Sequence, residues 1–207
     1  MKNIIFDFGG VIYDIDHSLS KKAFLKLGVS DFDQLYGHDI QTDLFEKMER
    51  GEIGDHEFRN ALRKYLPAHI SDNQIDHAWC ALLLGFEKQR IDLLQFLGEN
   101  YRLFILSNSN IIHANQFLAE LNEYSPFRKL FEDVWFSHEK GMRKPEKEFY
   151  QGLIDKHHLN LEETLFIDDL EVNILAAQEL GLQTHLLKPN ESILDLFDHG
   201  QWVKSDD

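Results

Sequence analysis

The feature that most constrains the fold is an alternation in the second half of the chain between short apolar runs and longer helical stretches. The apolar runs are residues 103–106, 134–136, 165–167 and 184–187. Such an alternation is typical of a parallel sheet that is buried on both faces. A similar run, residues 3–6, stands near the start of the chain. The sequence therefore predicts a doubly wound α/β core with its first strand at residues 3–6.

A block without strand candidates separates this first strand from the others. Helices are expected at residues 20–27, 32–50, 55–66, 71–84 and 87–97, and glycine or proline residues separate them. One strand, then a helical block, then more strands indicates an insertion. We therefore expect a core of residues 1–15 and 88–207, with an α-helical subdomain of residues 16–87 inserted into it.

The composition narrows the classes of function. The 207 residues include 21 basic and 36 acidic side chains, a formal charge of −15 that no basic block offsets. A nucleic-acid or anionic-membrane surface is therefore disfavoured, and an anionic substrate would need a bound divalent cation and a few well-placed lysines or amides. The single cysteine, Cys80, cannot form an internal disulfide, and we expect neither a signal peptide nor a membrane-spanning segment. We expect a cytoplasmic protein, either a monomer or a homodimer.

Polar residues and glycines stand at the ends of the expected strands and before one helix, where an α/β sheet forms its ligand crevice. They are Asp7 with Gly9 and Gly10, Ser107 with Asn108, Lys144, and Asp168 with Asp169. The glycines let the backbone leave the strand sharply and approach a ligand closely.

These residue types suit a metal-dependent reaction of a phosphate. Carboxylates at Asp7 and Asp168 supply the oxygen ligands that Mg²⁺ prefers. Ser107 and the amides after it can hold phosphate oxygens, and Lys144 supplies the positive charge that a phosphate and an attacking carboxylate both need. Each residue alone also has a structural interpretation, as a turn residue, a helix cap or a surface charge. Their joint position at one crevice favours the chemical interpretation.

The ordered set resembles the haloacid dehalogenase-like superfamily, whose four motifs run in this order over a Rossmann-like core. The resemblance covers essentially the whole chain, and residues 17–87 resemble the helical cap of that superfamily. It implies that Asp7 is the nucleophile and that Lys144 belongs to the catalytic set. It further implies that Asp7, the Gly9 carbonyl and Asp168 bind Mg²⁺. Asp169 is then a ligand through water or a group that orients Asp168 and Lys144. The phosphate of the substrate would be bound by Ser107, Asn108, Lys144 and Gly10.

A narrower resemblance links residues 7–16, 105–110 and 141–146, together with His113, to bacterial alpha-D-glucose-1-phosphate phosphatases. One departure from the superfamily concerns the residue two positions after the nucleophile, which is usually an Asp that transfers protons. This chain has Gly9 there. Loss of such a group costs roughly 10²- to 10⁴-fold in rate unless another group compensates. Candidates for that compensation are Asp14, Asp16 and His113, each of which also has a purely structural interpretation.

The sequence thus predicts a Mg²⁺-dependent phosphatase that acts on a small phosphorylated metabolite. A sugar phosphate such as alpha-D-glucose 1-phosphate is the expected substrate, and an aspartyl-phosphate is the expected intermediate. Two alternatives stay open. Because of Gly9, the protein could be a catalytically weak or silent relative that binds a phosphorylated ligand. Because residues 79–84 are apolar, the helical block could instead serve as a surface for a protein partner.

Overall fold

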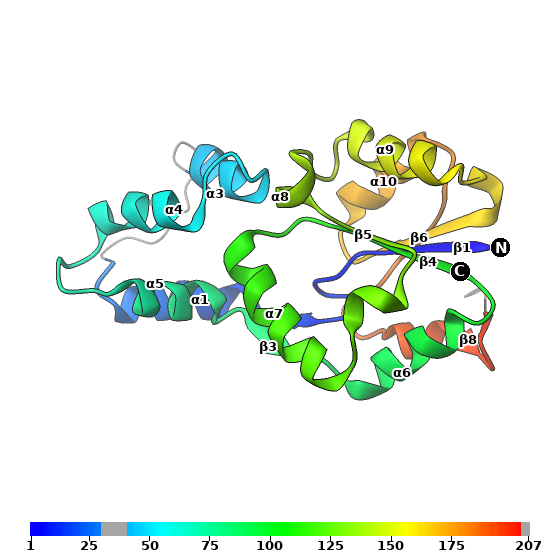
Figure 1. Cartoon of the computed structure of the whole chain (residues 1–207), viewed down its shortest axis with the longest axis horizontal. Coiled ribbons are helices and arrows are strands. Elements are labelled where there is room, and N and C mark those ends of the chain that lie inside the picture. The colour runs from blue at the N-terminus through cyan, green and yellow to red at the C-terminus, as the bar shows by residue number, and fades with distance from the viewer. Residues whose placement is uncertain (30–40, 204–207) are drawn as a thin grey trace.

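The structure, a computed structural model, describes residues 1–29 and 41–203, without the side chains of residues 41–43. Its core is a five-stranded parallel sheet in the order β5-β4-β1-β6-β7 (Figure 1). The strands are β1 (Asn3–Phe6), β4 (Arg102–Ser107), β5 (Asp133–Phe136), β6 (Thr164–Asp168) and β7 (Gln183–Leu186). In the middle of the sheet, Phe6 pairs with Ile105 on one side and Ile167 on the other. This sheet confirms the predicted fold class, and each strand overlaps an expected apolar run.

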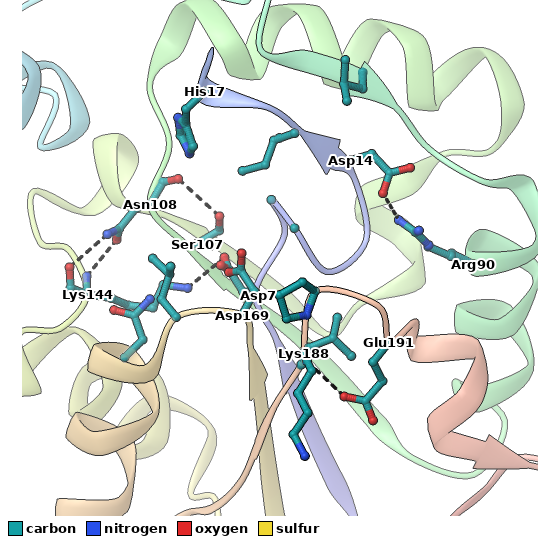
Figure 2. A pocket seen from close by; sticks show the side chains of 18 of the residues that line it. Asp7, Asp14, His17, Arg90, Ser107, Asn108, Lys144, Asp169, Lys188 and Glu191 are labelled. Carbon is teal, nitrogen blue, oxygen red and sulfur yellow. Dashed lines mark hydrogen bonds and ion pairs between the residues drawn. The ribbon is translucent and has the colours of Figure 1, made fainter. Parts of the chain in front are cut away.

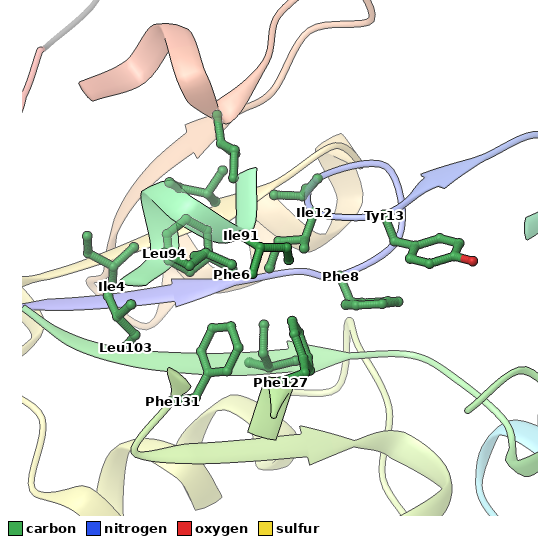
Figure 3. Close-up of a cluster of buried hydrophobic side chains, with 14 of the residues drawn as sticks. Ile4, Phe6, Phe8, Ile12, Tyr13, Ile91, Leu94, Leu103, Phe127 and Phe131 are labelled. Carbon is green, nitrogen blue, oxygen red and sulfur yellow. The ribbon is translucent and has the colours of Figure 1, made fainter. Parts of the chain in front are cut away.

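Successive residues of the strands pack on opposite faces of the sheet, because side chains alternate along a strand. Phe6 and Ile105 belong to an apolar cluster with helices α6 (Lys88–Leu97) and α7 (Ile111–Tyr124), part of which Figure 3 shows. Phe104 belongs to a second cluster, on the other face, with helices α9 (Lys147–His157) and α10 (Glu171–Glu179). Both faces are therefore covered, which explains why the strands read as continuous apolar runs.

The helical insertion forms its own apolar cluster beside the sheet. Its helices are α1 (His17–Lys26), α3 (Gln41–Glu49), α4 (Asp55–Leu62) and α5 (Asp72–Cys80), and they extend away from the core in Figure 1. Phe45, Met48 and Trp79 are buried between these helices and are at most 7% exposed. The expected helix at 32–50 is described only from residue 41, so its first part lies outside the described residues. We call the insertion the cap, with residues 16–87 as its proposed limits.

Two short strands connect the cap with the core. Strand β2 (Asp14–Ile15) pairs antiparallel with β3 (Leu83–Gly85). The expectation of continuous helix over residues 71–84, with no strand in the block, is therefore wrong. α5 ends at Cys80, and the chain then becomes extended because β2 provides a pairing partner that sequence periodicity does not reveal. Trp79, Cys80 and Leu82 of this segment are buried, which weakens the interpretation of residues 79–84 as a partner surface.

The remaining described elements are short. They are the helix α8 (Ser137–Lys140), the 3₁₀ turns η1 (Arg63–Tyr65), η2 (Phe127–Leu130), η3 (Leu161–Glu163) and η4 (Ile193–Leu196), and the unpredicted hairpin of β8 (Phe197–Asp198) and β9 (Gln201–Trp202). None of the helices in residues 1–29 and 41–203 is long and apolar enough to cross a membrane.

Candidate active site

A buried lysine lies between two carboxylates at the carboxyl ends of the central strands. Lys144 Nζ lies 2.8 Å from Asp7 Oδ1 and 2.6 Å from Asp168 Oδ2, and its side chain is 1% exposed. Asp7 follows β1 directly, and its backbone N–H donates to Ile167 of the neighbouring strand. A buried charge is tolerated only where it is paired. The sheet therefore brings Asp7, Lys144 and Asp168 together, as the strand-end pattern predicts.

The electrostatic environment of the carboxylates is strongly perturbed. Burial raises the pKa of Asp7 to about 7, Lys144 opposes the increase, and Asp168 and Asp169 add to it. Burial and Asp168 also raise the pKa of Asp169. Burial works against the charge of Lys144, but Asp168 and Asp7 outweigh it and raise the lysine pKa. One lysine thus faces three acidic groups, which leaves an excess of negative charge.

This donor set fits a small, hard cation. Oxygen atoms of Asp7, Asp168 and Asp169 all lie within 4.8 Å of one another. Mg²⁺ binds through one or two carboxylates together with water and substrate oxygens, and its charge would balance the acidic excess. Gly10 lies directly beside this group, with a φ of +76°, and a Cβ there would collide with the Asp169 carboxylate. Glycine at this position therefore permits both the turn and the close approach of Asp169.

Hydrogen bonds to neighbouring residues fix the orientation of the central groups. Asn173 Nδ2 lies 3.0 and 3.1 Å from the two oxygens of Asp168. Asn108 holds the backbone of Lys144 on both sides, because its side chain accepts from the lysine N–H at 2.8 Å and donates to the lysine C=O at 2.9 Å. Ser107 is buried beside Asn108. These two hydrogen bonds show that Asn108 supports the backbone of the loop that carries Lys144.

A cavity of about 690 Å³ opens in front of these groups, as Figure 2 shows. Core residues, the two connecting strands and the cap all contribute to its wall. Its lining residues include Asp7, Gly9, Gly10, Asp14, His17, Glu49, Arg90, Ser107, Asn108, Arg143, Lys144, Asp169 and Lys188. A smaller cavity of about 100 Å³ shares lining residues with it and reaches between cap and core, where Phe8, Trp79 and Leu82 form an apolar part of its wall. The site can thus hold a phosphate and an organic group of moderate size.

The three candidates for proton transfer occupy different environments. Asp14 lines the larger cavity and accepts a hydrogen bond from Arg90 Nη1 at 2.7 Å. Asp16 is the N-cap of α1 and accepts from Ser18 N–H at 2.9 Å. His113 lines the smaller cavity, and burial lowers its pKa to about 4. Its ring stacks on Trp79, with 4.8 Å between the ring centroids.

Pro145, which follows Lys144, lies outside the next helix. α9 begins at Lys147, and Glu146 is its N-cap. The loop thus continues for two residues beyond Lys144, which places Glu146 beside the cap.

Sequence reasoning missed several residues that line the larger cavity. His17 and Glu49 come from the cap, and Arg90 and Arg143 come from the core. Arg143 stands next to Lys144 in the chain, and that position is its only sequence signal. The other three reach the cavity through the packing of the cap and α6 against the sheet ends, which no local pattern shows.

Comparison with known proteins identifies the class to which this fold and site belong. The family described as haloacid dehalogenase-like hydrolase matches residues 1–181. The chain is 32% identical over 186 residues to D-ribitol-5-phosphate phosphatase from Bacteroides thetaiotaomicron, which covers 89% of this chain and 90% of the relative. It is 28% identical over 182 residues to a sesquiterpene phosphatase from Aspergillus oryzae, with 87% of each protein covered.

Among solved structures, a haloacid dehalogenase-family enzyme from Bacteroides thetaiotaomicron in complex with magnesium and inorganic phosphate has a similar fold. The TM-score is 0.87 at 34% identity, and the match covers 96% of this chain and 100% of that one. The protein belongs to the haloacid dehalogenase-like hydrolases. The predicted superfamily is therefore confirmed. The narrower resemblance to alpha-D-glucose-1-phosphate phosphatases stays a prediction, and a relative at 32% identity is instead named for a polyol phosphate.

Proposed function

We propose that the protein is a Mg²⁺-dependent phosphomonoesterase that hydrolyses the phosphate ester of a small polyhydroxylated compound, a sugar phosphate or a polyol phosphate. The observation that carries the proposal is the buried arrangement of Asp7, Lys144 and Asp168 at the floor of a cavity that the cap covers. Relatives named as phosphatases of ribitol 5-phosphate and glyceraldehyde 3-phosphate support this class of reaction. Alpha-D-glucose 1-phosphate belongs to the same substrate class.

In the proposed reaction, an Asp7 oxygen attacks the phosphorus atom in line with the leaving oxygen. The bond between phosphorus and the leaving oxygen breaks, and an aspartyl-phosphate forms on Asp7. Water then attacks this phosphorus, which releases inorganic phosphate and restores the Asp7 carboxylate. Lys144, Ser107 and Asn108 hold the phosphate oxygens and stabilise their charge. The Gly10 N–H, which the sequence assigns to the same role, instead donates to the Tyr13 carbonyl at 2.9 Å. Asp7, the Gly9 carbonyl and Asp168 would hold Mg²⁺, which supplies further charge neutralisation, and Asp169 would bind it through water or orient Asp168.

Proton transfer needs a group other than residue 9, and we assign it to Asp14 in preference to Asp16 and His113. Asp14 is the one of the three candidates that lines the larger cavity. Both ring nitrogens of His113 have partners, Nδ1 with Asn110 Nδ2 at 3.0 Å and Nε2 with the Trp79 carbonyl at 3.1 Å. Asp16 is engaged as a helix cap. Arg90 Nη1 keeps Asp14 in place from the side of the core. As an acid, Asp14 would give a proton to the leaving oxygen in the first step. As the resulting base, it would take a proton from the water that attacks the aspartyl-phosphate, which restores its starting state.

The test is phosphate release from a panel that contains ribitol 5-phosphate, glyceraldehyde 3-phosphate and alpha-D-glucose 1-phosphate, with Mg²⁺ and with EDTA. Release by the wild type with Mg²⁺, and its loss in Asp7→Asn or in EDTA, is expected. If folded wild type releases no phosphate from any ester, the alternative of a silent protein that binds a phosphorylated ligand is favoured. Asp14→Asn is expected to lower kcat at least tenfold, whereas Asp16→Asn and His113→Gln should stay within threefold of the wild type.

A further inference from the structure

The end of α3 connects the cap with the loop that carries Lys144. Arg143 Nη2 of the loop lies 2.9 Å from Glu49 Oε2 of the cap. The next residue of the cap, Arg50, donates from Nη1 to Glu146 Oε2 of the loop at 3.0 Å, and Arg50 Nη2 also contacts Glu146 Oε1. These four side chains are 20% to 32% exposed. We call the two ion pairs the clasp.

The backbone beside the clasp also packs directly on the core. Gly51 follows Arg50 with a φ of +66°, and a Cβ at this position would collide with the backbone oxygen of His138 in α8. α3 and α8 lie side by side in Figure 1. At this contact between cap and core, the clasp lies next to a glycine that permits close approach of the two backbones.

The core side of the clasp is the fixed side. Asn108 holds the backbone N–H and C=O of Lys144, and the lysine side chain is held by Asp7 and Asp168. On the cap side, Glu46 accepts hydrogen bonds from Arg50 at 2.8 and 3.1 Å and orients the guanidinium toward Glu146. The clasp therefore joins a preoriented arginine of the cap to a loop that the catalytic groups already hold in place.

The clasp lies at the end of α3 that carries Glu49. Glu49 lines both cavities, and it is the one residue that the described part of α3 contributes to either wall. We propose that Arg50 and Glu146 are positioning residues, which hold the cap against the core and so keep Glu49 in the wall of the substrate cavity. The proposal rests on the proposed phosphatase activity. Neither Arg50 nor Glu146 lines the cavities, so the role proposed for them is to place the cap and not to contact the substrate.

Charge reversal and its repair test this role. Arg50→Glu is expected to lower kcat/KM at least tenfold for the ester that the wild type hydrolyses fastest, because misplacement of the cap disturbs substrate positioning. The inhibition constant of inorganic phosphate should stay within about twofold of the wild-type value, because the core residues that hold phosphate are unchanged. The double variant Arg50→Glu/Glu146→Arg restores an ion pair and is expected to recover kcat/KM to within about threefold of wild type.

The matched control is Arg63→Glu, since Arg63 pairs with Asp72 inside the cap. It should leave kcat/KM unchanged. Circular dichroism and a melting curve check that each variant is folded. Wild-type kcat/KM in Arg50→Glu, or a double variant as impaired as Arg50→Glu, would overturn the proposal.

If the wild type itself shows no turnover, the proposed function fails, and hydrogen exchange at residues 44–52 still tests the clasp. Exchange should be faster in Arg50→Glu and return to wild-type rates in the double variant, and equal rates in all three proteins contradict the clasp.

Discussion

Ile15 fills the space beside Gly9. A Cβ built on Gly9 would lie 3.1 Å from Ile15 Cδ1, which is closer than such atoms ordinarily pack. The usual proton-transfer Asp of the superfamily would occupy this position, and here an apolar side chain from β2 lies there instead. The strand that leads into the cap thus packs into the space where a carboxylate at position 9 would begin.

The Gly9→Asp variant should therefore gain little by itself. The new side chain meets Ile15, and such overpacking typically costs about 1–3 kcal/mol in the free energy of unfolding. Ile15→Val removes the Cδ1 atom, so Gly9→Asp/Ile15→Val should be more stable than Gly9→Asp and should turn over faster. Urea unfolding and kcat measure the two effects, with Ile15→Val alone as the control. Equal stability of the single Gly9 variant and the double variant would contradict this packing argument.

Removal of the Asn173 amide should weaken metal binding. Asn173 Nδ2 contacts both oxygens of Asp168, and loss of a group that orients a metal ligand typically lowers affinity about 10- to 100-fold. We expect Asn173→Leu to raise the Mg²⁺ concentration needed for half-maximal activity by such a factor. Gln178→Leu on the same helix is the control, because Gln178 bonds Thr184 away from the site. The idea fails if both variants need the same Mg²⁺ concentration as wild type.

Mg²⁺ affinity should fall as the pH decreases below about 7. Burial raises the pKa of Asp7 to about 7 in the metal-free protein, and a carboxylate must lose its proton before it binds the metal. The dissociation constant should therefore be nearly constant from pH 8 to above pH 7 and rise by up to about tenfold per pH unit below it. Calorimetric titration at pH 8, 7 and 6 and constant ionic strength measures this trend. A constant dissociation constant over the whole range contradicts it.

His113 should make folding sensitive to acid. Its pKa in the folded protein is about 4, below its ordinary value of 6.5, because burial disfavours the charged ring. As the pH falls, His113 takes up a proton in the unfolded chain before it does so in the folded protein. The free energy of unfolding is therefore unaffected by this residue above pH 6.5 and decreases as the pH falls toward 4. The loss is on the order of 3 kcal/mol. Urea unfolding at pH 7.5 and 5.0 should show a smaller pH effect in His113→Gln than in wild type, and identical effects would contradict the prediction.

The fold could be predicted largely because the strands are buried on both faces. The run 103–106 and its counterparts are apolar throughout, so their sequence differs clearly from that of the amphipathic helices around them. β2 and β3 have only two and three residues, and their pairing joins Asp14 and Gly85 across a gap of about 70 positions in the chain. No periodicity can appear in so short a segment, so the helix predicted over residues 71–84 continues past Cys80, where α5 ends.

The acidic residues at the floor of the site could be predicted from the topology of the sheet. Asp7 directly follows β1 and Asp168 ends the neighbouring parallel strand β6, so their side chains meet at one edge of the sheet. Glu49 and Arg50 lie at the end of a helix, and their approach to the Lys144 loop depends on how the whole cap packs. The Ile15 contact with Gly9 likewise depends on the path of the chain after the strand. Long-range packing of this kind leaves no local signal.

The antiparallel pair of β2 and β3 brings the two ends of the inserted segment next to each other. The chain therefore leaves the core and returns to it at nearly the same place. Replacement of the cap by a different helical unit, or its shortening to a tight turn, would leave the order and register of the five core strands unaltered. The chemistry proposed for Asp7 can thus be combined with a different cap by exchange of a single continuous piece of chain.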